Sequence, residues 1–191
     1  MQTPQTNPLL SLSPLDGRYK AKCEELSPFF SEYGLIFYRL RVEIEWLKTL
    51  CNCSKIVELS AFKSSDLQSL DSIIDKFSLE DAQRVKDIEK ITNHDVKAVE
   101  YFLKEKLEKN SDLKPLTEFI HFACTSEDIN NLAYALMIKD SRDKVLLPVM
   151  REIFERISVL ARSYSEQPML SRTHGQPASP TTVGKEFANV A

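Results

Sequence analysis

The stretch SEYGLIFYRLRVEIEWLKTLC, residues 31–51, decides between a helical and a strand-based fold. Residues 40–46 alternate between apolar and polar side chains, as a strand would. Over the whole stretch, apolar side chains recur at the spacing of one helical face, at Ile36, Leu40, Ile44, Leu47 and Cys51. Because the stretch is long and rich in Leu, Arg, Glu and Lys, it predicts a helix. Arg39 and Glu43 form an i,i+4 charge pair that we expect outside the apolar face.

Glycine is scarce in the rest of the chain. Four glycines occur in 191 residues, and residues 35–174 contain none, against an average of ~7%. The P-loop and the G-x-G-x-x-G fingerprint both need several glycines where the backbone approaches a phosphate. The composition therefore excludes Walker-type ATPases and Rossmann dehydrogenases. It also disfavours a β-sandwich or barrel, whose many tight turns use glycine.

The charges of the chain nearly balance. It has 25 Lys and Arg against 28 Asp and Glu, a formal net charge of −3, so no summed field attracts it to nucleic acid or anionic lipid. No apolar stretch reaches the ~20 residues that span a bilayer. The first residues also lack the basic segment and apolar core of a signal peptide. The sequence predicts a cytoplasmic protein with neither nucleic acid nor a membrane as partner.

The cysteine pattern predicts no metal site. Cys51 and Cys53 flank a single residue, no C-x-x-C pair occurs, and a second pair of zinc ligands is missing. We expect all four cysteines, which include Cys23 and Cys124, to be reduced side chains in a helical interior.

Helical patterns separated by polar interruptions make up most of the chain. Residues 1–30 carry four prolines and are expected to form an irregular arm that ends in a short helical turn. Thr92 and Asp95 are placed like a shortened capping box. Pro148 is expected to break or kink a helix near residues 144–148, because it lacks an N–H and clashes with the preceding turn. These patterns predict an all-α protein.

Two of the three histidines lie in the polar interruptions. His94 follows Asn93, and His174 precedes Gly175, which permits close approach of the backbone. Histidine is well suited to proton transfer, since its unperturbed pKa is ~6.5. His121 lies among apolar residues instead, so a satisfied core or interface histidine is favoured there over a catalytic one.

Two further pairs of residues are candidates for anion binding. Arg18 and Tyr19 follow a glycine and could clamp a phosphate, because a guanidinium offers two donors and a phenol adds another. Thr125 and Ser126 open a helix, where hydroxyls, free N–H groups and the positive end of the dipole favour a carboxylate or phosphate. A surface arginine and simple helix capping explain Arg18 and Thr125 equally well.

Four stretches of the sequence together resemble the adenylosuccinate lyase family of the bacterial type, which belongs to the fumarase/aspartase superfamily. The stretches are LDGRY (15–19), TNHDVKAVEYFL (92–103), FIHFACTSEDINN (119–131) and SRTHGQPA (171–178). The Thr-Ser-x-Asp junction is shared across the superfamily, including argininosuccinate lyase and fumarase. The stretch from residue 92 is much more specific.

The resemblance implies an N-terminal helical domain over residues 1–123 and, over residues 124–191, the truncated start of a long central helical bundle. It implies a β-elimination that releases fumarate from adenylosuccinate, giving AMP, and from the succinylated aminoimidazole carboxamide ribotide of purine biosynthesis. The substrate is thus a small nucleotide, no metal or other cofactor is required, and the full-length enzyme is a homotetramer.

The resemblance also assigns roles to residues. His174 matches the general acid that protonates the departing nitrogen, and Arg18 and Tyr19 match substrate contacts. Contacts with the phosphate or dicarboxylate end of the substrate are matched by Asn93, His94, Asp95, Thr125 and Ser126. The family's mobile loop with the general-base serine is absent, so we expect an N-terminal fragment that is inactive alone.

Two alternatives remain open at the level of the sequence. Another fumarate-releasing lyase, such as argininosuccinate lyase, fits the superfamily signal, but a substrate without phosphate does not need the donors at residues 93–95. A non-enzymatic helical interaction module is the other alternative. The helical pattern that continues to Ala191 argues against it, because a bundle helix without neighbours exposes its core face.

Overall fold

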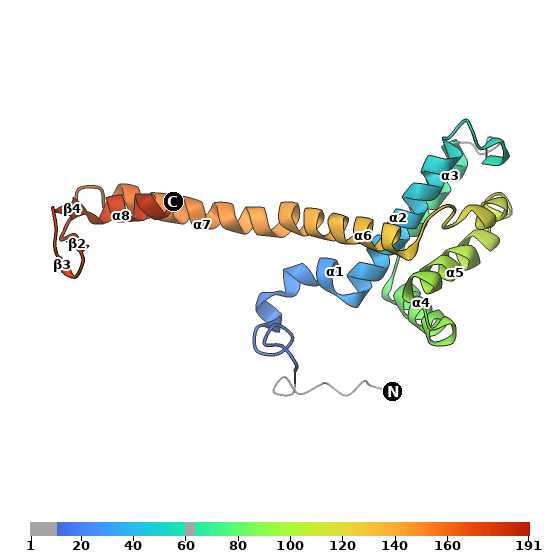
Figure 1. Cartoon of the computed structure of the whole chain (residues 1–191), viewed down its shortest axis with the longest axis horizontal. Coiled ribbons are helices and arrows are strands. Elements are labelled where there is room, and N and C mark those ends of the chain that lie inside the picture. Colours follow the sequence, from blue (N-terminus) through green and yellow to red (C-terminus); the bar gives the residue numbers. More distant parts are fainter. Residues whose placement is uncertain (1–10, 60–63) are drawn as a thin grey trace. The chain divides into compact units, whose positions relative to one another are not determined.

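The computed structural model describes residues 11–59 and 64–191, and within these ranges the chain is helical (Figure 1). The helices are α1 (Ser27–Phe30), α2 (Glu32–Cys51), α3 (Ser64–Asp75), α4 (Leu79–Thr92), α5 (Asp95–Glu108), α6 (Ser126–Ser141), α7 (Leu147–Ser163) and α8 (Val183–Val190). Strands β1 (Pro168–Met169), β2 (Arg172–Thr173), β3 (Gln176–Pro177) and β4 (Thr181–Thr182) have two residues each. The predicted all-α class is confirmed.

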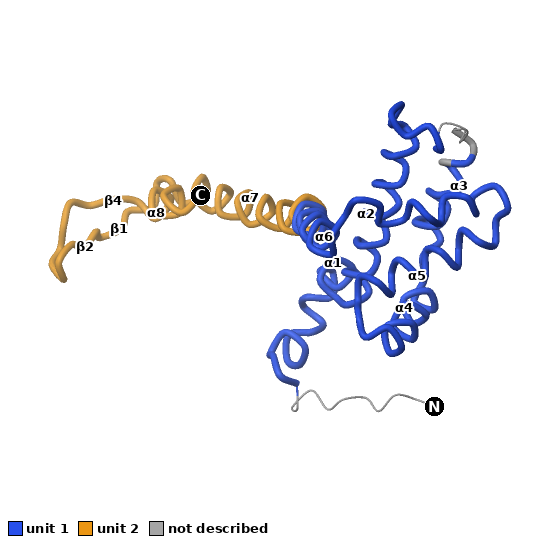
Figure 2. The backbone as a smooth tube through the Cα atoms, turned by 45° about the vertical axis from the view of Figure 1, so that its right-hand side comes forward, with its two compact units in different colours: residues 1–140 blue, residues 141–191 orange. Residues whose placement is uncertain are grey.

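The chain divides into two compact units, residues 1–140 and 141–191 (Figure 2). Unit 1 contains α1 to α5 and nearly all of α6, and unit 2 contains α7, α8 and the four strands. The domain boundary expected between Ala123 and Cys124 differs from this division of contacts and stays a prediction.

Helix α2 is the central helix of unit 1. The Ser31 side chain caps it by accepting a hydrogen bond from the Gly34 N–H. Leu40, Val42 and Ile44 are all buried, so the apolar residues of α2 face several neighbours and are not confined to one stripe. This explains why the sequence of α2 also alternates like a strand.

The charge pair predicted for the solvent side of α2 is wrong. Arg39 and Glu43 are both buried, with 4% and 0% of their surface exposed. Each of them binds a group outside α2, as described below. The i,i+4 spacing was correct for a helix but carried no information on which neighbours the two charges meet.

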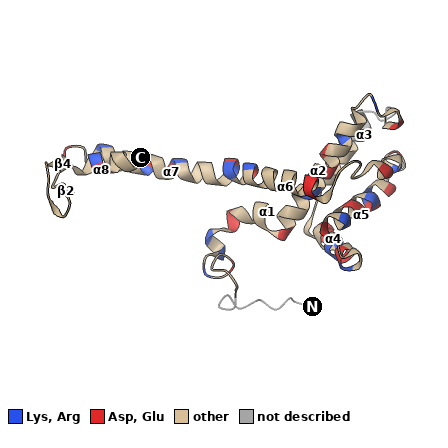
Figure 3. Cartoon of the chain, in the orientation of Figure 1, with Lys and Arg blue, Asp and Glu red and all other residues tan. Residues whose placement is uncertain are grey.

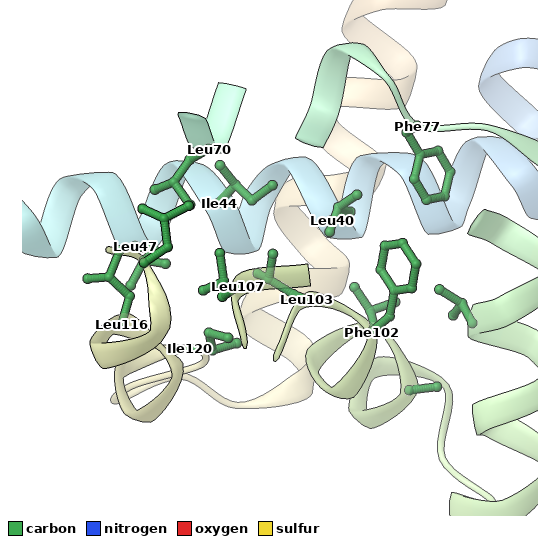
Figure 4. Packing of buried hydrophobic residues seen from close by; sticks show 14 of the residues in the cluster. Leu40, Ile44, Leu47, Leu70, Phe77, Phe102, Leu103, Leu107, Leu116 and Ile120 are labelled. Atoms are coloured by element: carbon green, nitrogen blue, oxygen red, sulfur yellow. The ribbon is translucent and has the colours of Figure 1, made fainter. Parts of the chain in front are cut away.

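The hydrophobic core of unit 1 lies between α2 and the helices that pack against it (Figure 4). Leu40, Ile44 and Leu47 of α2 face Leu103 and Leu107 of α5. The Phe77 and Phe102 rings meet edge to face with centroids 6.0 Å apart. At about 1.5 to 3 kcal/mol for each fully buried large side chain, this core fixes α5 on α2 and thereby sets where α5 begins.

Basic and acidic residues are interspersed along α4 and α5 (Figure 3). Arg84 on α4 donates to Glu105 on α5 through Nε and Nη2. Lys106 bonds Asp81, which also closes a capping box with Ser78 at the start of α4. Among the described residues, no helix is both long and apolar enough to cross a membrane.

In unit 2, α8 packs directly on α7. A Cβ on Gly184 would lie 2.6 Å from the Ser165 nitrogen, so the glycine permits the close approach. Strands β1 and β4 pair antiparallel, as do β2 and β3, so residues 168–182 form a pair of short ribbons. Near Pro148, the predicted interruption takes the form of a π-helical turn over Arg142–Leu146.

Candidate functional site

The junction between α4 and α5 consists of Asn93 and His94. Asn93 ends α4 in the left-handed conformation, with φ 51°. His94 is the N-cap of α5, and its Nδ1 accepts a hydrogen bond from the Lys97 N–H at 3.2 Å. The shortened capping box expected from Thr92 is therefore wrong, because His94 does the capping. With Nδ1 as acceptor, the neutral ring carries its proton on Nε2, and half of the side chain is exposed.

Asp95 is the first residue of α5, and both of its carboxylate oxygens accept hydrogen bonds. Oδ1 accepts from the Val96 N–H at 2.9 Å, and Oδ2 accepts from Arg39 Nη2 at 2.6 Å. Partial burial alone would raise the pKa of Asp95, but the Val96 N–H and the guanidinium outweigh it and lower this pKa below its ordinary value. Asp95 is therefore a fixed negative charge beside His94.

A second polar junction precedes α6, and its backbone is unusual. His121 and Ala123 have φ of 62° and 58°, in the left-handed region that side chains other than glycine rarely adopt. Thr125 then donates to Asp128 Oδ2 from its N–H at 2.7 Å and from its hydroxyl at 2.9 Å. Ser126, half-buried, begins α6.

A buried carboxylate holds the strained part of this junction. Glu43 Oε1 lies 2.6 Å from His121 Nδ1, and Oε2 accepts from the His121 N–H at 3.2 Å. Burial raises the pKa of Glu43, and nearby Glu100 adds to the rise, while the hydrogen bonds with His121 act in the opposite direction. The satisfied histidine favoured by the sequence is what the structure has.

Three residues of α2 form a stripe, which we define as Arg39, Glu43 and Trp46. Each of them bonds a group at or beside one of the two junctions. Trp46 Nε1 donates to the Phe122 carbonyl at 2.8 Å, and Arg39 Nε donates to Asn130 Oδ1 at 2.8 Å. The three residues are spaced i, i+4 and i+7, so they lie on one face of the helix. Sequence reasoning missed this α2 stripe; the i,i+4 charges were its only signal.

An apolar groove of about 460 Å³ borders the second junction. Trp46 and Leu132 line it together with Cys124, whose thiol immediately precedes Thr125. Burial, and then the carboxylates of Glu43 and Asp128, raise the pKa of this thiol.

Arg18 and Tyr19 lie in the first part of unit 1. The Arg18 guanidinium stacks over the Tyr19 ring, 5.3 Å from its centroid, and both side chains are exposed. Arg18 also lines a hollow of about 820 Å³ formed by residues between Ser13 and Ser31. An exposed guanidinium at a hollow of this size can bind an anion.

His174 lies in unit 2, at the tip of the β2–β3 ribbon. It and Gly175 are the two loop residues, with φ of 50° and 76°. A two-residue hairpin turn with positive φ at both positions favours glycine, asparagine or aspartate, and His174 is none of these. The turn presents the exposed imidazole to solvent.

Within unit 1 the structure brings together the two polar junctions, because Arg39 bonds Asp95 in one and Asn130 in α6, the helix that follows the other. Arg18 and Tyr19 belong to the hollow near the start of the described chain. Among residues 11–59 and 64–191, no group of three or more His, Cys, Asp and Glu side chains is placed to hold a metal ion.

Comparisons with known proteins point to one family. A family model described as "Lyase" matches residues 17–191. The chain is 55% identical over 183 residues to adenylosuccinate lyase of Escherichia coli (strain K12). The matched residues are 96% of this chain and 40% of that protein. It is 53% identical to adenylosuccinate lyase of Haemophilus influenzae (97% and 41%) and 51% identical to that of Legionella pneumophila (strain Corby; 95% and 40%). The chain thus spans about 40% of the length of these relatives.

Proposed function

The chain belongs to the lyase family whose model matches it, and from this premise we propose that the protein acts as an adenylosuccinate lyase. The observation that carries the proposal is the identity of 51 to 55% to curated adenylosuccinate lyases over almost the whole chain. The proposed reaction releases fumarate from adenylosuccinate to give AMP, and from the succinylated carboxamide ribotide of purine biosynthesis.

The proposed chemistry is a β-elimination. A base removes a proton from the carbon beside one carboxylate of the succinyl group, the C–N bond breaks, and the departing nitrogen takes up a proton. His174 is the proposed general acid for the last step, since histidine is the side chain that most often transfers protons in enzymes and the imidazole is exposed at the tip of its turn. No group among the described residues is assigned as the base.

The remaining site residues are proposed to bind the substrate. Donors are needed for the phosphate and for the two carboxylates, one of which carries the developing negative charge. Arg18, Tyr19 and the Nε2–H of His94 supply such donors, and Asn93 offers an amide next to His94. Asp95 places a negative charge next to His94, and Thr125 with Ser126 opens α6, where the helix N-terminus favours an anion.

We further infer that the complete gene product assembles as a homotetramer in the cytoplasm. Large apolar side chains are exposed along α7, namely Val149, Met150, Ile153, Phe154, Val159 and Leu160, and such a surface favours burial against other helices. The four cysteines are free, as is usual in a reducing compartment. Light scattering of the purified gene product tests the assembly; a monomer would contradict it.

The function is tested by assaying the complete gene product for fumarate release from adenylosuccinate and, separately, from argininosuccinate. We expect turnover of adenylosuccinate only. Turnover of argininosuccinate alone would replace the proposed substrate. If neither substrate reacts while circular dichroism shows a folded helical protein, the lyase function is wrong for this protein and an interaction module is favoured. The 191-residue chain alone is expected to be inactive.

A further inference from the structure

Arg39 is a buried arginine that bonds Asp95 at the first polar junction of unit 1 and Asn130 in α6, the helix that follows the second junction. We propose that Arg39 is a positioning residue that holds the Asn93–Asp95 junction and the N-terminal part of α6 in one fixed arrangement for substrate binding. The inference rests on the proposed function for its kinetic part. Its structural part stands on the contacts alone.

The contacts of Arg39 are specific in geometry. Nη2 donates to Asp95 Oδ2 at 2.6 Å and Nε donates to Asn130 Oδ1 at 2.8 Å, with 4% of the side chain exposed. A guanidinium is planar and its donors have fixed directions, so the two acceptors are held at a set separation. A lysine ammonium is a single point and cannot reproduce this fork.

Two of the other bonds at the junctions are local. His94 caps its own helix through Lys97, and Thr125 is held by Asp128 three residues later. Such caps fix the backbone of each junction but not the distance between the junctions. Glu43 and Trp46 reach the second junction, at His121 and Phe122. Arg39 adds the link from that segment to the first junction.

Burying the Arg39 guanidinium costs free energy, which argues that its two hydrogen bonds serve a function. Removing a guanidinium from water is unfavourable unless its partners are well placed, and apolar replacements of buried ion pairs are often no less stable. Arg39 would therefore be a poor choice for filling space between α2, α5 and α6. Its value lies in direction, because the carboxylate it holds stands next to His94, whose Nδ1 lies 3.7 Å from Asp95 Oδ1.

The test compares Arg39→Lys with Arg84→Lys in the complete gene product. Arg84 is a matched control, because it also donates through Nε and Nη2 to a carboxylate on α5, at an exposed pair with Glu105. For adenylosuccinate, we expect R39K to raise KM about tenfold, with kcat changed by less than about threefold, the pattern of lost binding common to ground and transition states. R84K should leave both constants within about twofold, as expected for a surface pair.

A double substitution checks that Arg39 acts through Asp95. Because contacting residues do not contribute independently, R39K combined with Asp95→Asn should raise KM no more than the larger single change. Effects that multiply, or a KM for R39K equal to that of R84K, would overturn the proposal. A fall in kcat with KM unchanged would overturn it as well, since Arg39 would then act on the chemical step.

Hydrogen exchange separates this inference from the function. If the unsubstituted protein releases no fumarate, the proposed function fails, and Arg39 is judged by exchange in the same proteins. R39K should speed exchange of the amides of residues 94–98 and 126–131 together, and R84K should not. Faster exchange at one junction only, or at neither, contradicts the link.

Discussion

At the scale of the residue, four non-glycine residues in the described ranges have left-handed backbone: Asn93, His121, Ala123 and His174. Such a conformation costs roughly 1 to 3 kcal/mol for a residue with a side chain and persists where the surroundings enforce it. The enforcement is visible at His121, whose N–H and ring both bind the buried Glu43. All four lie in the polar junctions or the β2–β3 turn, the segments to which binding and catalysis are assigned.

His174→Ala in the complete gene product should lower kcat for fumarate release by about 10² to 10⁴, the usual contribution of one general acid or base. Steady-state kinetics measure the loss, and circular dichroism verifies the fold. Ser179→Ala, exposed in the same unit, is the control and should keep normal turnover. An H174A enzyme with near-normal kcat would remove His174 from the mechanism.

Asp95→Asn should make the stability of the chain less sensitive to acid. The pKa of Asp95 in the folded state lies below its ordinary 3.8, so the folded state favours the charged form. That contribution is present above pH 3.8 and disappears as the pH falls through the folded value. Urea midpoints between pH 2.5 and pH 7 should therefore differ most between D95N and the parent near neutrality, and converge in acid.

Asp112→Asn provides the comparison for this titration, since Asp112 is exposed in the loop after α5. D112N should follow the parent curve throughout. A constant difference between D95N and the parent across the whole pH range would mean that the charge of Asp95 does not stabilise the fold.

At the scale of the element, the sequence was sufficient to find the helices but not what they touch. Periodicity located α2, because its apolar side chains recur at helical spacing within the segment itself. It placed Arg39 and Glu43 outside the apolar face, since hydrogen-bond partners 56 to 91 residues away leave no local pattern. The residues at the junctions were named correctly as polar interruptions. The prediction took Thr92 for the cap and missed His94, because imidazole is an uncommon N-cap acceptor.

Gly184→Ala should loosen α8 from α7. The added Cβ would lie 2.6 Å from the Ser165 nitrogen and 2.7 Å from its Cα, both backbone atoms, so α8 must shift. We expect faster hydrogen exchange across Val183–Val190, with unit 1 unchanged. Asn189→Ala, exposed on the same helix, should exchange like the parent; equal exchange in G184A would show that the two helices are not closely packed in solution.

At the scale of the whole molecule, the position of the domain boundary can be tested by comparing the free energies of unfolding of chains that end at each candidate boundary. Ile129, Ala133 and Met137 of α6 are buried in unit 1, and Tyr38 donates to Asp140 at the end of α6 at 2.9 Å. Two large apolar side chains at about 1.5 to 3 kcal/mol each suggest roughly 3 to 6 kcal/mol. Residues 1–140 should therefore be more stable than residues 1–123 by about this amount.

Urea unfolding of the two truncated chains measures the difference, with the 191-residue chain as reference. Equal midpoints would support the boundary between Ala123 and Cys124 that the sequence predicted. Trp46 fluorescence can follow the unfolding of both truncated chains. Its indole donates to the Phe122 carbonyl, and residue 122 is still present in the shorter chain.

The Cys124 thiol can serve as a chemical reporter on the segment before α6. A thiol reacts with alkylating reagents as its thiolate, and the raised pKa of Cys124 keeps that form scarce while the junction is closed. Because Cys124 lines the groove beside Thr125, a nucleotide bound there should slow its alkylation, and this slowing would report occupancy without any turnover.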